Sequence, residues 1–347
     1  MAVLTLTSTE YDTFPPVLKE YASYTSMIKG NSEKTVCEYL LDLRTFFRYY
    51  LMRESKKQYS IDEFEKIDIT SISEKEVKAV TPSLIIDFLM YTGFQRKNNT
   101  STRMRKLCAL KSFYKYAYSR KHIVETNPTV DIDSPKKSKT LPKYMTVDES
   151  VHFLETVRSD ITSKTLVRDF AIVSLFLNTG MRLSELVGLN LNSFDSDMTR
   201  VTVTGKGDKQ RVIYLNSAAR RAVIDYLKIR LDPKHIITSD TAFFLSKRQQ
   251  RISNKTVQWM VNKYLDLSGF GGRGLSVHKL RHTAATLMYQ SGKVDIRVLK
   301  DILGHEQLNT TQIYTHVVDQ NMEDAMEKNP LSDIKINAKL PYDFDDD

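Results

Sequence analysis

Two histidines, an arginine and a tyrosine lie near one another in the last quarter of the sequence. His278 and Arg281 are three positions apart, so on a helix they project from one face. His305 follows Gly304 directly, and Tyr314 lies nine residues further on. Cationic groups, a second histidine and a phenol that converge on one anion indicate chemistry at a phosphate. We expect that phosphate to belong to DNA and Tyr314 to attack it.

Cleavage of a phosphodiester requires three chemical roles. Cations must neutralise the non-bridging oxygens in the pentavalent state, and arginine forks suit that geometry. A tyrosine, whose unperturbed pKa is about 10, needs nearby positive charge or a base before it can attack. A mobile lysine can protonate the departing 5′ oxygen. The residues that cover these roles are Arg182, Lys206, His278, Arg281, His305 and Tyr314.

Short helices and one hairpin must position these side chains. The basic pair lies within an apolar stripe typical of a helix, formed by Leu280, Ala284, Leu287 and Met288. A second periodic run over residues 296–303 ends at Gly304, a usual helix-stop residue. Residues 309–311 resemble a new helix start, which places Tyr314 in the first turns of that helix.

The other two candidates follow predicted elements further upstream. Residues 167–178 are apolar on nearly all sides, which predicts a central buried helix that ends just before Arg182. The β-rich runs 200–204 and 211–215 flank the turn G-K-G-D-K-Q and predict a hairpin with Lys206 in its turn. Further helices are expected from Thr146 to Val157, from Ser217 to Leu231 and from Ser253 to Leu267.

The N-terminal part reads as a helical domain over residues 15–121. Its segment 53–80 is polar and weakly periodic, which predicts a loop with one short helix. The expected fold class is mainly α with a small β-sheet. The expected division is a helical core DNA-binding domain at 1–126, a linker at 127–142, a catalytic domain at 143–330 and an acidic tail at 331–347.

Basic residues on the predicted helix 101–120 and in the linker are candidates for contact with the DNA backbone. The candidates are Arg103, Arg105, Lys106, Lys111, Lys115, Lys136 and Lys137. A solvated helix face explains the charges on the helix equally well, and a plain surface connection explains those of the linker nearly as well.

Composition narrows the partners and the compartment. The chain has 347 residues, a net charge of +9 and 41% hydrophobic residues, which favours a soluble protein with a polyanionic partner. Cys37 and Cys108 both lie in apolar helical patterns, so we expect two buried reduced thiols without a disulfide or zinc site. The sequence lacks a signal peptide pattern and a long apolar segment, which predicts a cytoplasmic protein.

Four motifs carry a resemblance to a known family: T-G-M-R-L-S-E-L, G-K-G-D-K-Q-R, H-K-L-R-H-T and L-G-H. With Tyr314 placed after them, the chain resembles the tyrosine recombinases, or phage-type integrases, and among them the bacterial Xer-type enzymes. The resemblance implies a SAM-like core-binding domain followed by an α+β catalytic domain. The segment 53–80 is longer than the segment that Xer-type proteins usually have at this place, and the tail after Pro330 extends beyond the end expected for such proteins.

The resemblance also implies roles for individual residues. These are phosphate binding by Arg182 and Arg281, acid catalysis at the 5′ oxygen by Lys206, acid–base assistance by His278, phosphate hydrogen bonding by His305 and a 3′-phosphotyrosyl link on Tyr314. That link conserves the bond energy, so no cofactor and no metal is expected. The partners implied are double-stranded recombination sites and a homo- or hetero-tetramer that exchanges strands through a Holliday junction. Its C-terminal helix, near residues 320–328, would dock on a neighbouring protomer, and an accessory protein is a further possible partner.

Three alternatives remain open at this stage. A DNA-architectural protein could use the same fold without turnover, and a type IB topoisomerase-like enzyme could use the same chemistry without strand exchange. His278, His282, His305 and His316 suggest a metal-dependent nuclease, but neither an H-E-x-x-H pattern nor a cysteine pair accompanies them. Glu185 either orients an arginine or is a helix-surface acid. The biological tasks left open are chromosome-dimer resolution, mobile-element integration or excision, and inversion.

Overall fold

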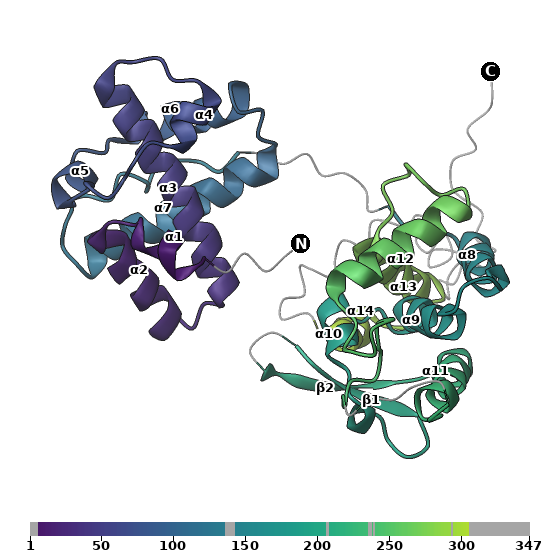
Figure 1. Cartoon of the computed structure of the whole chain (residues 1–347). Coiled ribbons are helices and arrows are strands. Elements are labelled where there is room, and N and C mark those ends of the chain that lie inside the picture. Colours follow the sequence, from purple (N-terminus) through teal and green to yellow (C-terminus); the bar gives the residue numbers. More distant parts are fainter. Residues whose placement is uncertain are drawn as a thin grey trace, which may run out of the picture. The chain divides into compact units, whose positions relative to one another are not determined.

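The computed structural model describes residues 6–135, 143–205, 208–234, 238, 240–292 and 294–304. The chain divides into two compact units, Met1–Lys139 and Thr140–Asp347. Figure 1 shows the first as a cluster of helices and the second as helices combined with a β-hairpin. The prediction of a mainly helical fold with a small sheet is confirmed.

The first unit is built around two long helices that pack against each other. Its helices are α1 (Ser8–Asp12), α2 (Pro16–Met27), α3 (Glu33–Ser55), α4 (Ile61–Glu65), α5 (Glu74–Lys78), α6 (Pro82–Phe94) and α7 (Thr100–Ser119). Ser32 and Thr81 cap α3 and α6 through their side-chain oxygens. Phe46, Phe88 and Phe113 are fully buried in the core around α3 and α7.

The segment 53–80 contains two short helices, α4 and α5, instead of the single one expected. Each begins with a capping box, formed by Ser60 with Glu63 and by Ser73 with Glu76. Phe64 and Val77 anchor the two helices in the core of the unit. Both helices thus begin at an S-x-x-E pattern, a local helix-start signal that lies within a segment of polar composition.

The predicted linker begins later than residue 127. Thr129 and Ile132 are buried, and Ile132 belongs to the core of the first unit. Residues 127–132 therefore fold with the helical unit.

The second unit surrounds a central helix. Its elements are α8 (Val147–Ser159), α9 (Leu166–Thr179), α10 (Leu183–Gly188), the 3-10 turn Leu191–Ser193, β1 (Arg200–Thr204), β2 (Gln210–Tyr214), α11 (Ser217–Arg230), α12 (Asn254–Leu267), α13 (Val277–Gln290) and α14 (Ile296–Leu303). The apolar α9 packs against α8, α11 and α13, which confirms the predicted buried helix. The expected helix starts at Thr146 and Ser253 are also confirmed as caps.

The hairpin and the last described helices carry the candidate site. β1 and β2 pair antiparallel, with Thr204 opposite Gln210 next to the turn. Leu299 and Leu303 bury α14 against α13, and Gly304 ends α14 in the left-handed conformation at φ +64°. His305, Tyr314, the expected C-terminal helix and the acidic tail lie outside the described residues.

Two further predictions concern cysteines and membranes. Cys37 is buried as expected, but Cys108 is exposed, because it lies on the side of α7 away from Leu107 and Leu110. No helix in the described part of the chain has the length and apolar character to cross a bilayer.

Candidate active site

Arg281 is fixed at the centre of the second unit. Leu280 and Ala284 hold α13 in the core, and the guanidinium of Arg281, only 3% exposed, points between α9 and α14. Its Nη1 donates to the Gly180 carbonyl at 2.6 Å, and its Nη2 donates to the Leu303 carbonyl at 2.7 Å. The arginine therefore ties together two helix C-termini, whose carbonyls carry partial negative charge.

Arg182 reaches the same helix end from the other side. It follows Gly180, which ends α9 at φ +63°, and it stands at the N-cap position of α10. Its Nη2 donates to the Gly304 carbonyl at 2.8 Å, the carbonyl next to the one that Arg281 holds. The structure thus brings together Arg182 and Arg281, the two arginines for which the family resemblance implies phosphate binding. This pair is called the phosphate clamp below.

Glu185 and Arg211 complete this arrangement. The Glu185 side chain is fully buried and accepts two hydrogen bonds from Arg211, at 2.6 and 2.9 Å, and one from Arg182 Nη1 at 2.9 Å. Burial raises the pKa of this carboxyl, but the hydrogen bonds and charge of Arg211 and the backbone N–H of Arg182 outweigh burial and lower it. Glu185 is therefore an arginine-orienting carboxylate and not a helix-surface acid.

The sequence did not single out Arg211 as part of the site. The available signal was its place as the last residue of G-K-G-D-K-Q-R, directly after the turn that contains Lys206. A single sequence cannot show that this side chain points inward and meets a carboxylate on α10. That contact depends on how the hairpin packs against α10.

His278 lies on the first turn of α13 beside the buried Arg281, with part of its surface exposed and part of its ring shielded from solvent. Partial burial lowers the pKa of its imidazole, and the charges of Arg281, Lys279 and Arg182 lower it further. The ring is therefore neutral near pH 7. Its edge meets the ring of His282, with 4.6 Å between the centroids. In the described ranges, no cluster of three or more histidine, cysteine or acidic side chains could hold a metal.

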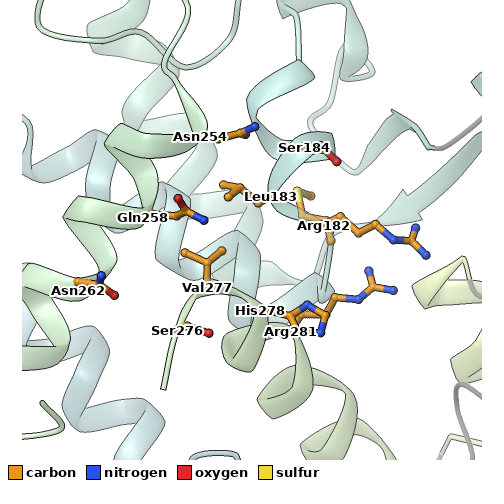
Figure 2. A pocket seen from close by; sticks show the side chains of 11 residues that line it. Arg182, Leu183, Ser184, Asn254, Gln258, Asn262, Ser276, Val277, His278 and Arg281 are labelled. Carbon is orange, nitrogen blue, oxygen red and sulfur yellow. The ribbon is translucent and has the colours of Figure 1, made fainter. Parts of the chain in front are cut away.

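A cavity of about 500 Å³ with polar and apolar lining residues opens next to these residues. Arg182, His278 and Arg281 line one side of it. Figure 2 shows the amide side chains of Asn254, Gln258 and Asn262 on α12, which line the other side one helical turn apart. Such a cavity offers cationic forks and amide hydrogen-bonding groups to an anionic, polar ligand.

Three of the six predicted catalytic residues are therefore brought together: Arg182, His278 and Arg281. Lys206, His305 and Tyr314 lie outside the described residues, and their roles remain predictions.

The basic residues predicted to contact the DNA backbone have different environments. Lys106 is only 7% exposed and its Nζ pairs with Asp42 at 2.8 Å, so its role is structural. Arg105 pairs with the other Asp42 oxygen at 2.8 Å and is partly exposed. Lys115 is exposed, while Arg103 and Lys111 are partly buried on the same helix; Lys136 and Lys137 lie outside the described residues. The prediction that Lys106 contacts the DNA backbone is therefore wrong, because its ammonium is buried in an ion pair.

A helical unit followed by a helix-and-hairpin unit, with two arginines that meet beside a histidine, has the cationic groups expected of a protein that acts on a phosphodiester. Comparison with known proteins identifies the family. Residues 143–321 match the model of the phage integrase family. The chain is 44% identical over 319 residues to "Tyrosine recombinase XerC" of Caldanaerobacter subterraneus subsp. tengcongensis, which covers 92% of this chain and 88% of that protein. The chain belongs to the phage integrase family and is a tyrosine recombinase, an enzyme of site-specific recombination.

Solved structures share the fold at lower identity. A XerH recombinase bound to a palindromic difH substrate, in a post-cleavage complex, has a TM-score of 0.66 at 19% identity and covers 90% of this chain and 94% of its own. A lambda integrase tetramer bound to a Holliday junction has a TM-score of 0.62 at 15% identity and covers 89% of this chain and 80% of its own. The architectural and topoisomerase-like alternatives are not favoured by the relatives.

Proposed function

We propose that this recombinase cuts DNA by attack of Tyr314 on a backbone phosphate and rejoins it after strand exchange. The observation that carries the proposal is the meeting of Arg182 and Arg281 on the neighbouring carbonyls of Gly304 and Leu303. A phosphate beside that helix end would lie next to two cationic forks, which favours the charge of the pentavalent state. The sequence leads from this helix end directly to His305 and then to Tyr314.

Each remaining side chain takes one chemical role. We assign proton donation to the 5′ oxygen to Lys206 and phosphate hydrogen bonding to His305, as the family resemblance implies. The lowered pKa of His278 supports an acid–base role, since a neutral imidazole can accept a proton near pH 7. The product of attack is a 3′-phosphotyrosyl ester and a free 5′ hydroxyl. Because the ester conserves the energy of the broken bond, rejoining requires no external energy source.

Strand exchange requires several protomers on two DNA sites. We propose a tetramer that resolves a Holliday junction, supported by the lambda integrase tetramer that shares this fold. In the same proposal, residues 320–328 dock on a neighbouring protomer, which is either an identical chain or a paralogue. The proposal also includes an accessory protein and a cytoplasmic location. DNA-backbone contact by the exposed Lys115 and the partly buried Lys111 on α7 also belongs to it.

A nicked suicide duplex tests the proposal. On such a substrate the cut strand loses a short fragment, so the covalent intermediate accumulates. The parent protein should form a protein–DNA adduct that survives denaturation, and Tyr314→Phe should form none while it still binds DNA. Tyr214→Phe, at a tyrosine that is 75% exposed on β2, is the matched control and should behave as the parent.

Further treatments separate the rival functions. Adduct formation should be unchanged in EDTA, and its loss there would favour the metal-dependent nuclease. Joining of strands between two labelled duplexes should occur, and relaxation of supercoiled DNA without such joining would favour the topoisomerase-like enzyme.

A further inference from the structure

The C-terminus of α14 is held by three arginines from three separate elements. The last carbonyls of the helix accept in order: Ile302 from Arg211 Nε at 3.1 Å, Leu303 from Arg281 Nη2 at 2.7 Å, and Gly304 from Arg182 Nη2 at 2.8 Å. These groups have no partner within the helix, and guanidinium groups offset their partial negative charge. The orientation of this helix end therefore depends on all three side chains.

Arg211 differs from the other two in what it faces. Its side chain is 16% exposed, and it is not among the described residues that line the cavity of Arg182, His278 and Arg281. Both of its Nη groups donate to Glu185, which also accepts from Arg182. Arg211 therefore contacts the groups that hold the phosphate clamp and does not reach the cavity itself.

Arg211 also joins chain segments that are far apart in sequence. It lies opposite Val203 in the hairpin, close to the turn that contains Lys206. Through Glu185 it reaches α10, and through the Ile302 carbonyl it reaches α14. Three of the segments that carry or lead to the predicted catalytic residues, the hairpin, α10 and α14, thus meet at one guanidinium.

Only an arginine can make this set of contacts from one side chain. Its planar group presents Nε on one edge and two parallel N–H donors to a carboxylate, whereas a lysine offers a point charge. Gly304 leaves the space for it: a Cβ there would lie 2.9 Å from Arg211 Nη1 and 3.0 Å from Cζ. The helix-stop glycine is therefore also a packing requirement of Arg211.

We propose that Arg211 is a positioning residue of the recombination reaction. It holds Arg182 through Glu185 and holds the end of α14 directly, so that the two arginines of the clamp, Arg182 and Arg281, and this helix end keep one geometry. The proposal rests on the proposed function, because it assigns the geometry that Arg211 maintains to phosphate cleavage.

Single-turnover cleavage at saturating DNA tests this role. Arg211→Met and Arg211→Lys should each lose on the order of 10²-fold in cleavage rate, as expected for a small misplacement of reacting groups, while the Kd for DNA stays within about threefold of the parent. Arg200→Met is the matched control, an arginine on the same hairpin whose side chain is 56% exposed, and it should cleave at the parental rate. The assay is run at a temperature at which circular dichroism shows each variant folded.

A second substrate identifies which groups Arg211 positions. A 5′-bridging phosphorothiolate has a leaving group that needs no acid, so it should restore the cleavage rate of Lys206→Ala but not that of Arg211→Met.

A second variant keeps the arginine but displaces its guanidinium. Gly304→Ala should show the same pattern of cleavage as Arg211→Met, and it replaces Arg211→Met in the test if that variant does not fold. Parental cleavage by folded Arg211→Met or Arg211→Lys, or full rescue of Arg211→Met by the thiolate, overturns the proposal. An adduct that persists in Tyr314→Phe would instead overturn the proposed function.

Discussion

Replacement of Glu185 by glutamine removes the charge on which the arginine arrangement depends. The carboxylate side chain is fully buried and accepts from the Arg182 backbone at 2.7 Å, from Arg182 Nη1 and from both Nη groups of Arg211. Breaking a buried ion pair costs about 3–5 kcal/mol. Because the Arg182 side chain is 38% exposed, solvent screens part of the loss, and we expect about 3 kcal/mol, at the low end of that range.

For a unit of this size, about 3 kcal/mol corresponds to a fall in Tm of roughly 6–12 °C. Urea unfolding followed by circular dichroism and by the single tryptophan, Trp259 on α12, reports on the second unit. Asp225→Asn is the control, because that carboxylate is exposed and pairs on the surface with Lys228 of the same helix; it should change stability by less than about 0.5 kcal/mol. A loss below about 1 kcal/mol in Glu185→Gln would refute the reasoning.

The pH dependence gives an independent check on the same carboxylate. The pKa of Glu185 is lowered from its ordinary value of 4.5 in the folded protein, so its contribution to stability is present above pH 4.5 and is lost as pH falls through the folded pKa. The stability difference between the parent and Glu185→Gln should therefore be constant near neutral pH and shrink below pH 4.5. A difference that grows on acidification contradicts this assignment.

Three further predictions concern neighbouring features. Gly180→Ala should destabilise by about 1–2 kcal/mol or more in urea unfolding, because φ is +63° and a Cβ would lie 2.9 Å from Leu303 Cδ2; an unchanged midpoint contradicts this. The cleavage rate should fall only below pH 6.5 through His278, whose pKa is lowered from that value, and a His278-dependent fall above pH 7 would refute a neutral imidazole. Lys115→Met should reduce the salt dependence of DNA binding by about one phosphate contact, whereas Lys106→Met should lower stability without changing that slope.

Local patterns in the sequence predicted the helices and the hairpin well. The predicted starts at Thr146 and Ser253 are caps in the structure, since a side-chain oxygen that satisfies the first N–H groups acts over only a few residues. The apolar run of α9 and the turn between β1 and β2 are also local signals. Over residues 53–80 the polar composition predicts one short helix, whereas two capping boxes begin the two helices α4 and α5.

Contacts between distant segments could not be predicted in the same way. Lys106 and Cys108 are two residues apart on α7, yet one is buried in an ion pair and the other is exposed. Periodicity marked the apolar side of α7 but could not show that Asp42 on α3 supplies a buried partner. The contacts of Arg211 cannot be predicted from local patterns for the same reason, because its partners on α10 and α14 lie elsewhere in the sequence.

The most direct test of the account is the chemical identity of the trapped protein–DNA bond. The adduct from a nicked suicide duplex is digested with trypsin and nuclease, and the modified peptide and the attached DNA end are identified by mass spectrometry. The account predicts a phosphodiester between the Tyr314 oxygen and a 3′ DNA end, with a free 5′ hydroxyl on the released strand. A bond to another residue, or a bond to the 5′ end, would contradict it.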